Sequence, residues 1–242
     1  MTHKLLKLAL FSACATVMSL FTLSAAPCVN GDTLAQYVSM YATAGCTYGG
    51  FTFSDFTYTD SASGAGGSLV TARDVYVYTA INADGSGLSF EASWDADGYG
   101  STSDGDVAFN VTVDSGAESI TDAGLAQTGG VAGSGIATVS EQGCGPIPCV
   151  PGTWQVLTFD AGTGPGEDQS SADTLLTSTG SVRVSKDINA NAGTGDGFDE
   201  ATITKVTDVF STVPEPRALS LLLGLGLVAG FVFRKKFQGA RA

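Results

Sequence analysis

The sequence predicts a mainly β protein, an antiparallel β-sandwich of the jelly-roll kind with one short N-terminal helix. Three observations predict this class. Short segments in which apolar and polar residues alternate recur through the middle of the 242-residue chain. Glycine, serine, asparagine and aspartate, the residues that turns need, separate these segments. Only one segment has apolar residues at helical spacing, and many short strands with polar turns favour two packed sheets.

The predicted helix runs from about Asp32, which can cap its start, to about Ala44, and Gly45 then ends it. Four apolar residues recur at helical spacing within it: Leu34, Tyr37, Val38 and Tyr41.

Strands follow the helix. Segments 51–53 and 56–58 both alternate, and the phase slip between them predicts a β-bulge. Segment 107–113 is the clearest strand, with four apolar residues on one face. The other predicted strands are 75–78, 88–90 leading to Trp94, 136–139, 154–159, 182–184 and 203–209.

The first 26 residues have the parts of a secretory signal peptide: lysines, then an apolar run over 8–23, then small residues at 24–26. A membrane anchor is the alternative, but the run is shorter than the ~20 residues that a spanning helix needs. Lipid attachment at Cys14 is a weaker alternative, because the apolar run in front of it is short. We therefore expect signal peptidase to remove this segment, cutting after Ser24, Ala25 or Ala26.

A second apolar segment, Ala218–Phe233, is followed at once by Arg234, Lys235 and Lys236. At 1.5 Å per residue, a helix over this segment would span roughly 24 Å, somewhat less than the bilayer core. Basic residues gather on the cytoplasmic side of membrane helices. The sequence therefore predicts a transmembrane helix with a cytoplasmic basic anchor and the preceding chain outside the inner membrane.

Pro214-Glu215-Pro216 stands just before this predicted helix, and its prolines favour an extended backbone. Pro-Glu-Pro, an apolar helix and a basic cluster, in this order, resemble the PEP-CTERM sorting signal of exported bacterial proteins. The resemblance implies that a membrane-embedded exosortase cuts near the motif and releases the protein to the cell surface or extracellular matrix. A plain tail anchor is the alternative. The predicted divisions are 1–26 (signal peptide), 27–212 (exported domain) and 213–242 (sorting signal).

The middle of the chain also resembles a class of PEP-CTERM proteins with no assigned biochemistry. The matching features are the Leu-x-x-Tyr pattern at 34–37, Gly45-Cys46, the Phe-Thr-Phe-Ser strand at 51–54 and the segment 184–187. This resemblance supports the architecture and implies no activity.

Composition limits the chemistry of the exported part. Residues 27–213 carry 23 acidic residues and four basic ones, a net charge of −19, which excludes nucleic acid as a partner. The single histidine, His3, lies in the signal peptide. Histidine-dependent nucleophilic catalysis and histidine-ligated zinc, copper and iron are therefore excluded from the exported part. We expect no enzymatic activity.

Four cysteines lie in the exported part: Cys28, Cys46, Cys144 and Cys149. An even number in an oxidising compartment predicts disulfides, and four cysteines allow three pairings. We favour Cys28 with Cys46 and Cys144 with Cys149, because each pair closes a short loop.

An acidic segment offers a candidate calcium loop. Asp95 and Asp97 fit its first and third positions, Gly100 its sixth and Asp106 its twelfth, with Asp104 close by. The alternative is a glycine-rich turn between two strands. A second oxygen-rich segment, 187–200, fits the calcium spacing worse. No other cofactor is expected.

We therefore expect an exported, non-catalytic component of the cell surface or extracellular matrix. The first alternative is a carbohydrate-binding module for extracellular polysaccharide, with Trp94 or Trp154 as a flat stacking surface, although tryptophans of a sandwich are more often core residues. The second is a secreted glycosidase, which needs two carboxylates but no histidine. No such pair can be named from the sequence.

Overall fold

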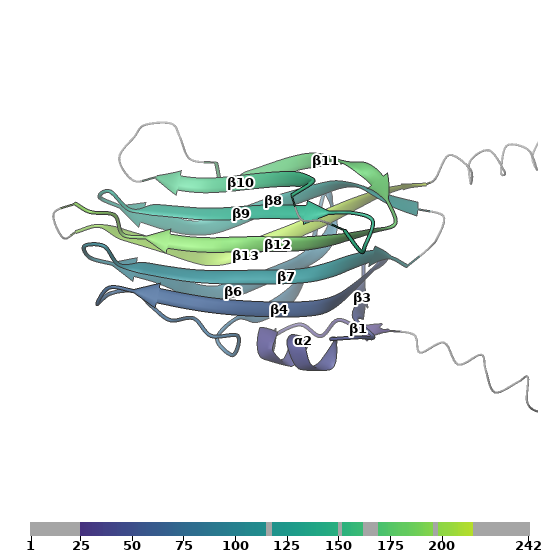
Figure 1. Cartoon of the computed structure of the whole chain (residues 1–242), viewed down its shortest axis with the longest axis horizontal. Coiled ribbons are helices and arrows are strands. Elements are labelled where there is room, and N and C mark those ends of the chain that lie inside the picture. The colour runs from purple at the N-terminus through teal and green to yellow at the C-terminus, as the bar shows by residue number, and fades with distance from the viewer. Residues whose placement is uncertain (1–24, 115–117, 150–151, 162–168, 196–197, 215–242) are drawn as a thin grey trace, which may run out of the picture.

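The computed structural model describes residues 25–114, 118–149, 152–161, 169–195 and 198–214. Two β-sheets pack face to face in this part of the chain, which confirms the predicted sandwich (Figure 1). The predicted signal peptide up to residue 24, Glu215, Pro216 and the basic anchor at 234–236 lie outside the described residues. Within the described ranges, no helix has both the length and the apolar character to cross a membrane.

The first sheet has seven strands among the described residues. In spatial order they are β1 (Ala26–Pro27), β3 (Cys46–Tyr48), β4 (Phe51–Ser63), β7 (Thr102–Val113), β12 (Ser181–Asn191), β9 (Ile136–Cys144) and β10 (Trp154–Ala161). All neighbours pair antiparallel except β1 and β3.

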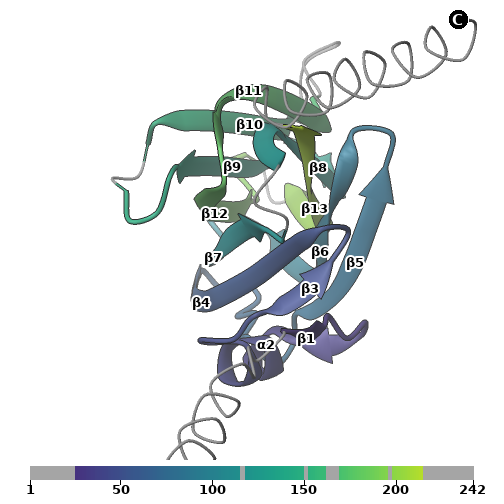
Figure 2. The same cartoon turned by 90° about the vertical axis from the view of Figure 1, so that its right-hand side faces the viewer.

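The second sheet has six described strands, all antiparallel. In spatial order they are β11 (Ser171–Thr179), β8 (Glu118–Ala132), β13 (Glu200–Pro214), β6 (Gly85–Asp97), β5 (Tyr76–Asn82) and β2 (Asp32–Thr33). Figure 2 shows the two layers end-on, with β4, β7, β12 and β9 on one side and β5, β6, β13 and β8 on the other.

Strict alternation builds the core between the sheets. In β7, Val107, Phe109 and Val111 are fully buried, while the residues between them lie on the outer face. Phe109 contacts the rings of Phe90 and Phe56, with centroids 5.8 and 5.5 Å apart. Aromatic rings from both sheets therefore fill the middle of the sandwich.

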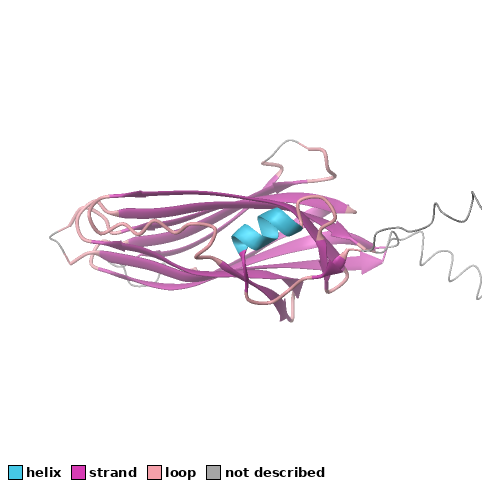
Figure 3. Ribbon diagram, turned by 90° about the horizontal axis from the view of Figure 1, so that it is seen from below, coloured by secondary structure: helices cyan, strands magenta, loops and turns pink. Residues whose placement is uncertain are grey.

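Helix α2 (Leu34–Met40) lies against β4 at one edge of the sandwich (Figure 3). Thr33 is its N-cap, in a reciprocal capping box with Gln36. The prediction that Asp32 caps the helix is therefore wrong, and the helix ends at Met40 rather than near Ala44, because Tyr41 leaves helical geometry.

Both predicted disulfides are confirmed. Cys28 bonds Cys46 with an S–S distance of 2.14 Å, and Cys144 bonds Cys149 at 2.10 Å. The first joins the chain just before α2 to β3, and the second closes the connection between β9 and β10. The predicted bulge in β4 is also confirmed: the register with β7 shifts between Ser54 and Thr57, and Asp55 has a φ of 55°.

The short strands β1, β2 and β3 were not predicted, and neither were two longer strands, β8 and β11. Small and polar residues dominate both, and their apolar residues do not alternate clearly. They nevertheless pair with each other and β8 pairs with β13, so they complete one side of the second sheet.

Candidate functional site

The predicted calcium loop does not exist as a loop. Asp95 and Asp97 lie in β6, where they alternate with buried Trp94 and face outward from the second sheet. Asp104 and Asp106 lie in β7 and face outward from the first sheet. The single-loop prediction is therefore wrong, because the segment crosses from one sheet to the other and separates the two pairs of aspartates.

The structure instead brings Asp104 and Asp106 beside Asp187 of β12, and we call these three residues the acidic trio. Their carboxylate oxygens lie within 4.8 Å of one another, and no other group of three or more metal-ligating side chains gathers so closely in the described part. The trio combines residues from both oxygen-rich segments of the sequence. Calcium binding itself stays a prediction.

Partial burial raises the pKa of Asp104, a hydrogen bond from the Asn189 amide (3.4 Å) lowers it, and the charge of Asp106 raises it further. Burial, followed by the charges of Asp104 and Asp106, raises the pKa of Asp187. Thr59 donates a hydrogen bond to Asp106 at 3.1 Å. The trio thus carries unrelieved like-charge repulsion on the outer face of the first sheet.

Trp94 is a core residue. Its side chain is fully buried, and its indole N–H donates to the Tyr58 hydroxyl at 3.3 Å. Burial raises the pKa of Tyr58 to about 12, so the hydroxyl stays protonated and donates to the carbonyl of Val70 at 2.7 Å. Gly105 leaves the room that both rings occupy. Trp94 cannot stack on a sugar.

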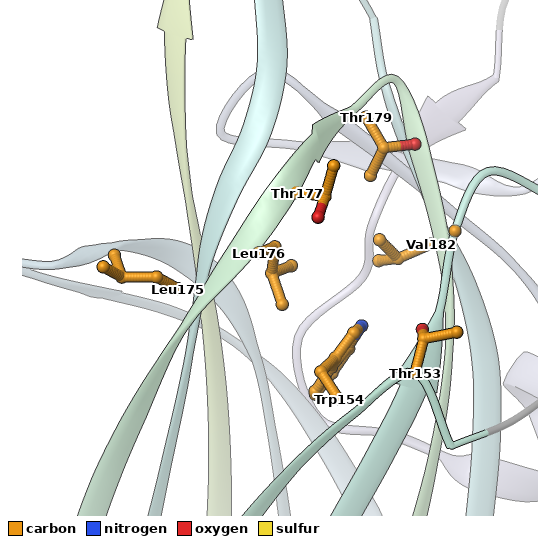
Figure 4. Close-up of a pocket in the computed structure, with 8 residues that line it drawn as sticks. Thr153, Trp154, Leu175, Leu176, Thr177, Thr179 and Val182 are labelled. Atoms are coloured by element: carbon orange, nitrogen blue, oxygen red, sulfur yellow. The ribbon is translucent and has the colours of Figure 1, made fainter.

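Trp154 is placed differently. It lies half-buried at the start of β10 and lines a hollow of about 270 Å³ at the edge of the sandwich (Figure 4). The other lining residues of this Trp154 hollow are Gly145, Thr153, Leu175, Leu176, Thr177, Thr179 and Val182. The indole lies over Gly143 of β9, where any Cβ would overlap the ring.

The hollow arises where β11 leaves regular pairing with β8. The register shifts between Leu175 and Thr179, so this part of β11 stands away from its partner strand. Leu175 is 85% exposed at the rim. The Trp154 indole nitrogen is buried but finds no hydrogen-bond partner among the described residues. The hollow thus combines an aromatic face with an unused donor and threonine side chains.

A third group lies inside the sandwich and was not predicted. Lys186, Glu141 and Asp208 are fully buried, and we call them the buried triad. Lys186 and Glu141 are direct cross-strand partners in β12 and β9, whereas Asp208 projects from β13 of the opposite sheet. The Lys186 ammonium contacts the Asp208 carboxylate directly and lies 3.5 Å from Oε2 of Glu141.

Aromatic rings surround the triad. The Lys186 nitrogen lies 4.5 Å from the ring centroid of Phe109 and 5.1 Å from that of Phe90. Burial, followed by the nearby charge of Asp208, raises the pKa of Glu141 well above its ordinary value. The interior therefore favours the neutral, protonated form of Glu141 over its carboxylate.

One signal could have located Lys186. Continuing the alternation of Val182 and Val184 past the predicted strand end places residue 186 on the buried face, followed by Ile188. The same alternation places Glu141 in phase with Ala137 and Val139, and Asp208 between Val206 and Phe210. What a single strand does not show is that the three side chains meet across the sandwich.

No family model and no curated protein matches this chain. Among solved structures, the enzymatically active domain of tailspike protein 4 from bacteriophage CBA120 is similar over 74% of this chain and 21% of its own, with 12% identity and a TM-score of 0.29. A carbohydrate-binding module of the β-sandwich superfamily is similar over 76% of this chain and 63% of its own, with 13% identity and a TM-score of 0.26. This chain thus spans about a fifth of the first protein and under two thirds of the second. At these TM-scores neither likeness indicates a function for this chain.

Proposed function

We propose that this protein is an exported, non-catalytic β-sandwich of the cell surface or extracellular matrix, released by cleavage at both ends. The observation that carries the proposal is where the fold begins and ends. The first described strand begins at Ala26, beside the predicted signal-peptide cut, and the last ends at Pro214, the first residue of the sorting motif. Cleavage near these positions would therefore remove at most the outermost residues of β1 and β13.

The covalent structure and charge support export. Two disulfides persist in oxidising compartments outside the cytoplasm. Three of the four basic residues in the exported part pair with carboxylates: Arg183 with Asp55, Lys186 with Asp208, and Lys205 with Glu91. The surface is therefore left strongly acidic, which favours solubility in a medium that contains cations.

The burial of Glu141 and Asp208 and the lack of histidine in the exported part support a non-catalytic role. Glycoside hydrolysis needs two carboxylates that face substrate. Glu141 and Asp208 lie close together but are fully buried, so no saccharide reaches them. The exported part also lacks histidine.

The sorting step is tested in the bacterium that makes the protein. Wild-type chain should be recovered outside the inner membrane, whereas a chain with Pro214, Glu215 and Pro216 changed to alanine should stay in the inner-membrane fraction. Thr212→Ala, just before the motif, is the matched control and should be released. Equal release of the motif variant would contradict the proposal.

Carbohydrate binding at the Trp154 hollow is the second candidate. The exposed edge position, the indole and the nearby hydroxyls favour it, since aromatic rings stack on the apolar faces of sugars. In a pull-down on the producing bacterium's own extracellular polysaccharide, wild-type protein should be retained and Trp154→Ala should not. Leu157→Ala, on the outer face of the same strand, should be retained. Retention of Trp154→Ala at the wild-type level would contradict this candidate.

A further inference from the structure

The buried triad has no part in either surface site, and its burial needs an explanation. An ammonium group and two carboxyl groups share an interior lined by Phe90 and Phe109, and none of the three side chains is exposed. Charges in such surroundings are strongly disfavoured unless hydrogen bonds satisfy them. Yet both oxygens of Glu141 and Oδ1 of Asp208 accept no hydrogen bond within the described ranges. The interior favours any change that removes these charges.

The geometry also brings an amine nitrogen against a carboxyl group. The Lys186 nitrogen touches the Asp208 carboxyl group, and Oε2 of Glu141 lies 3.5 Å from the same nitrogen. Alternating positions on β12 and β13 fix both side chains, because Lys186 lies between inward-facing Val184 and Ile188, and Asp208 lies in β13 between its partners β6 and β8. The amine and the carboxyl group are thus held in contact by the two sheets.

We propose that Lys186 and Asp208 condense into an intramolecular amide that joins β12 to β13 and so links the two sheets covalently. A proton first passes from the Lys186 ammonium to the Asp208 carboxylate, which leaves a neutral amine and a neutral acid. The amine attacks Cγ of Asp208 and forms the new C–N bond. One C–O bond then breaks, and the hydroxyl group leaves as water. An amine and a carboxylic acid become an amide and one water molecule, with no change of oxidation state.

Glu141 is the proton carrier for this reaction. In its protonated form it donates to the Asp208 oxygen while the nitrogen attacks, and as a carboxylate it then takes the proton that the nitrogen loses. It then gives a proton to the departing hydroxyl and takes back the proton of the remaining hydroxyl as the amide C=O forms, so it ends protonated, as it began. Burial raises the pKa of Glu141, which favours the protonated form that this role needs. Lys186 and Asp208 react once, and no external substrate takes part.

Mass spectrometry of the intact chain tests the bond directly. The full chain is exported with its disulfides formed, recovered, then reduced and alkylated. Its mass should be lower than that of the recovered sequence by one water molecule. Trypsin should then yield one branched peptide in which 184–205 is joined to 206 onward, because the amide blocks cleavage after Lys186. An unmodified wild-type mass overturns the proposal. Water loss that maps to another residue, such as an Asp-Gly imide, also overturns it.

Variants separate the roles of the three residues. Lys186→Met removes the nucleophile and should abolish the water loss, whereas Lys205→Met, at a half-exposed lysine of the second sheet, should retain it. Glu141→Gln leaves the nucleophile and Asp208 in place, and the recovered folded protein should lack the amide. Complete condensation in Glu141→Gln would overturn the role of Glu141. The mass of the wild-type protein tests the bond without any variant. The proposal can therefore be overturned even if a variant fails to fold.

Discussion

Among single residues, Asp104 and Asp106 of β7 and Asp187 of β12 bring three carboxylates together on the outer face of the first sheet. Asp95 and Asp97 were combined with Asp104 and Asp106 because they are close in the chain. Alternation in β6 and β7 sends the two pairs to the outer faces of different sheets. The true neighbour of Asp104 and Asp106 is Asp187, which strand pairing supplies and sequence spacing cannot show.

The acidic trio yields the first prediction. Because the pKa of Asp187 is raised in the folded protein, the folded state binds its proton more tightly than the unfolded state does. Stability is therefore lost as pH rises through this pKa. Asp187→Asn should raise the melting temperature at pH 7, and the gain should disappear near pH 3. Asp187 is exposed, so the gain is small, about 0.3 kcal/mol. Thermal melts at the two pH values measure it, and an equal or larger gain at pH 3 would contradict this account.

Asp199 should show the opposite dependence of stability on pH, because its pKa is lowered in the folded protein. Its carboxylate accepts the backbone N–H of Ser134 at 2.7 Å, and this hydrogen bond holds its pKa below the ordinary value. The stability that it contributes is present at neutral pH and is lost as pH falls through the lowered pKa. Asp199→Ala should therefore lower the melting temperature most at pH 7 and least in acid. A deficit that grows as the pH falls would show that the hydrogen bond has no such role.

At the scale of elements, the capping of α2 yields a third prediction. Thr33 caps the helix and Asp32 does not, so Thr33→Ala should reduce the free energy of unfolding by about 1 kcal/mol, and Asp32→Ala should not. Urea unfolding of both variants measures the difference. A larger loss for Asp32→Ala would restore the cap that the sequence alone suggested.

The two disulfides differ in the length of chain that they close. Cys28 and Cys46 are separated by 18 positions and Cys144 and Cys149 by five. In the chain-entropy account, removing the first should cost about 3 kcal/mol and removing the second about 2 kcal/mol. Paired Cys→Ser variants, compared by urea unfolding, measure both. A larger loss for the Cys144–Cys149 pair would show that the short loop matters through contacts of the native state.

Most of the strands could be predicted, and the exceptions have a physical reason. Segments such as 107–113 bury β-branched and aromatic residues on one face, and this pattern is visible in the sequence. β8 buries Ala123, Gly124 and Leu125 in succession and carries glycines at 129 and 130, so it lacks the alternation of a strand. It is a strand because it pairs with β13. Its strand character is set by tertiary contacts rather than by local propensity.

At the scale of the whole molecule, the sandwich joins its two sheets chiefly through apolar contact. The buried triad adds the only ion pairs among the described residues that have no exposure to solvent. The sandwich fold could be predicted from the sequence, because composition and apolar periodicity can be read from each segment alone. The buried triad could not be predicted in this way, because it depends on how β9, β12 and β13 face one another.

We propose that the sandwich is released from between two processing signals. The measurement that tests it most directly is mass spectrometry of the terminal peptides of protein collected outside the bacterium that makes it. We expect an N-terminus between residues 25 and 27 and a C-terminus between 213 and 216. Released protein that still carries the segment Phe231–Lys236 would contradict the claim.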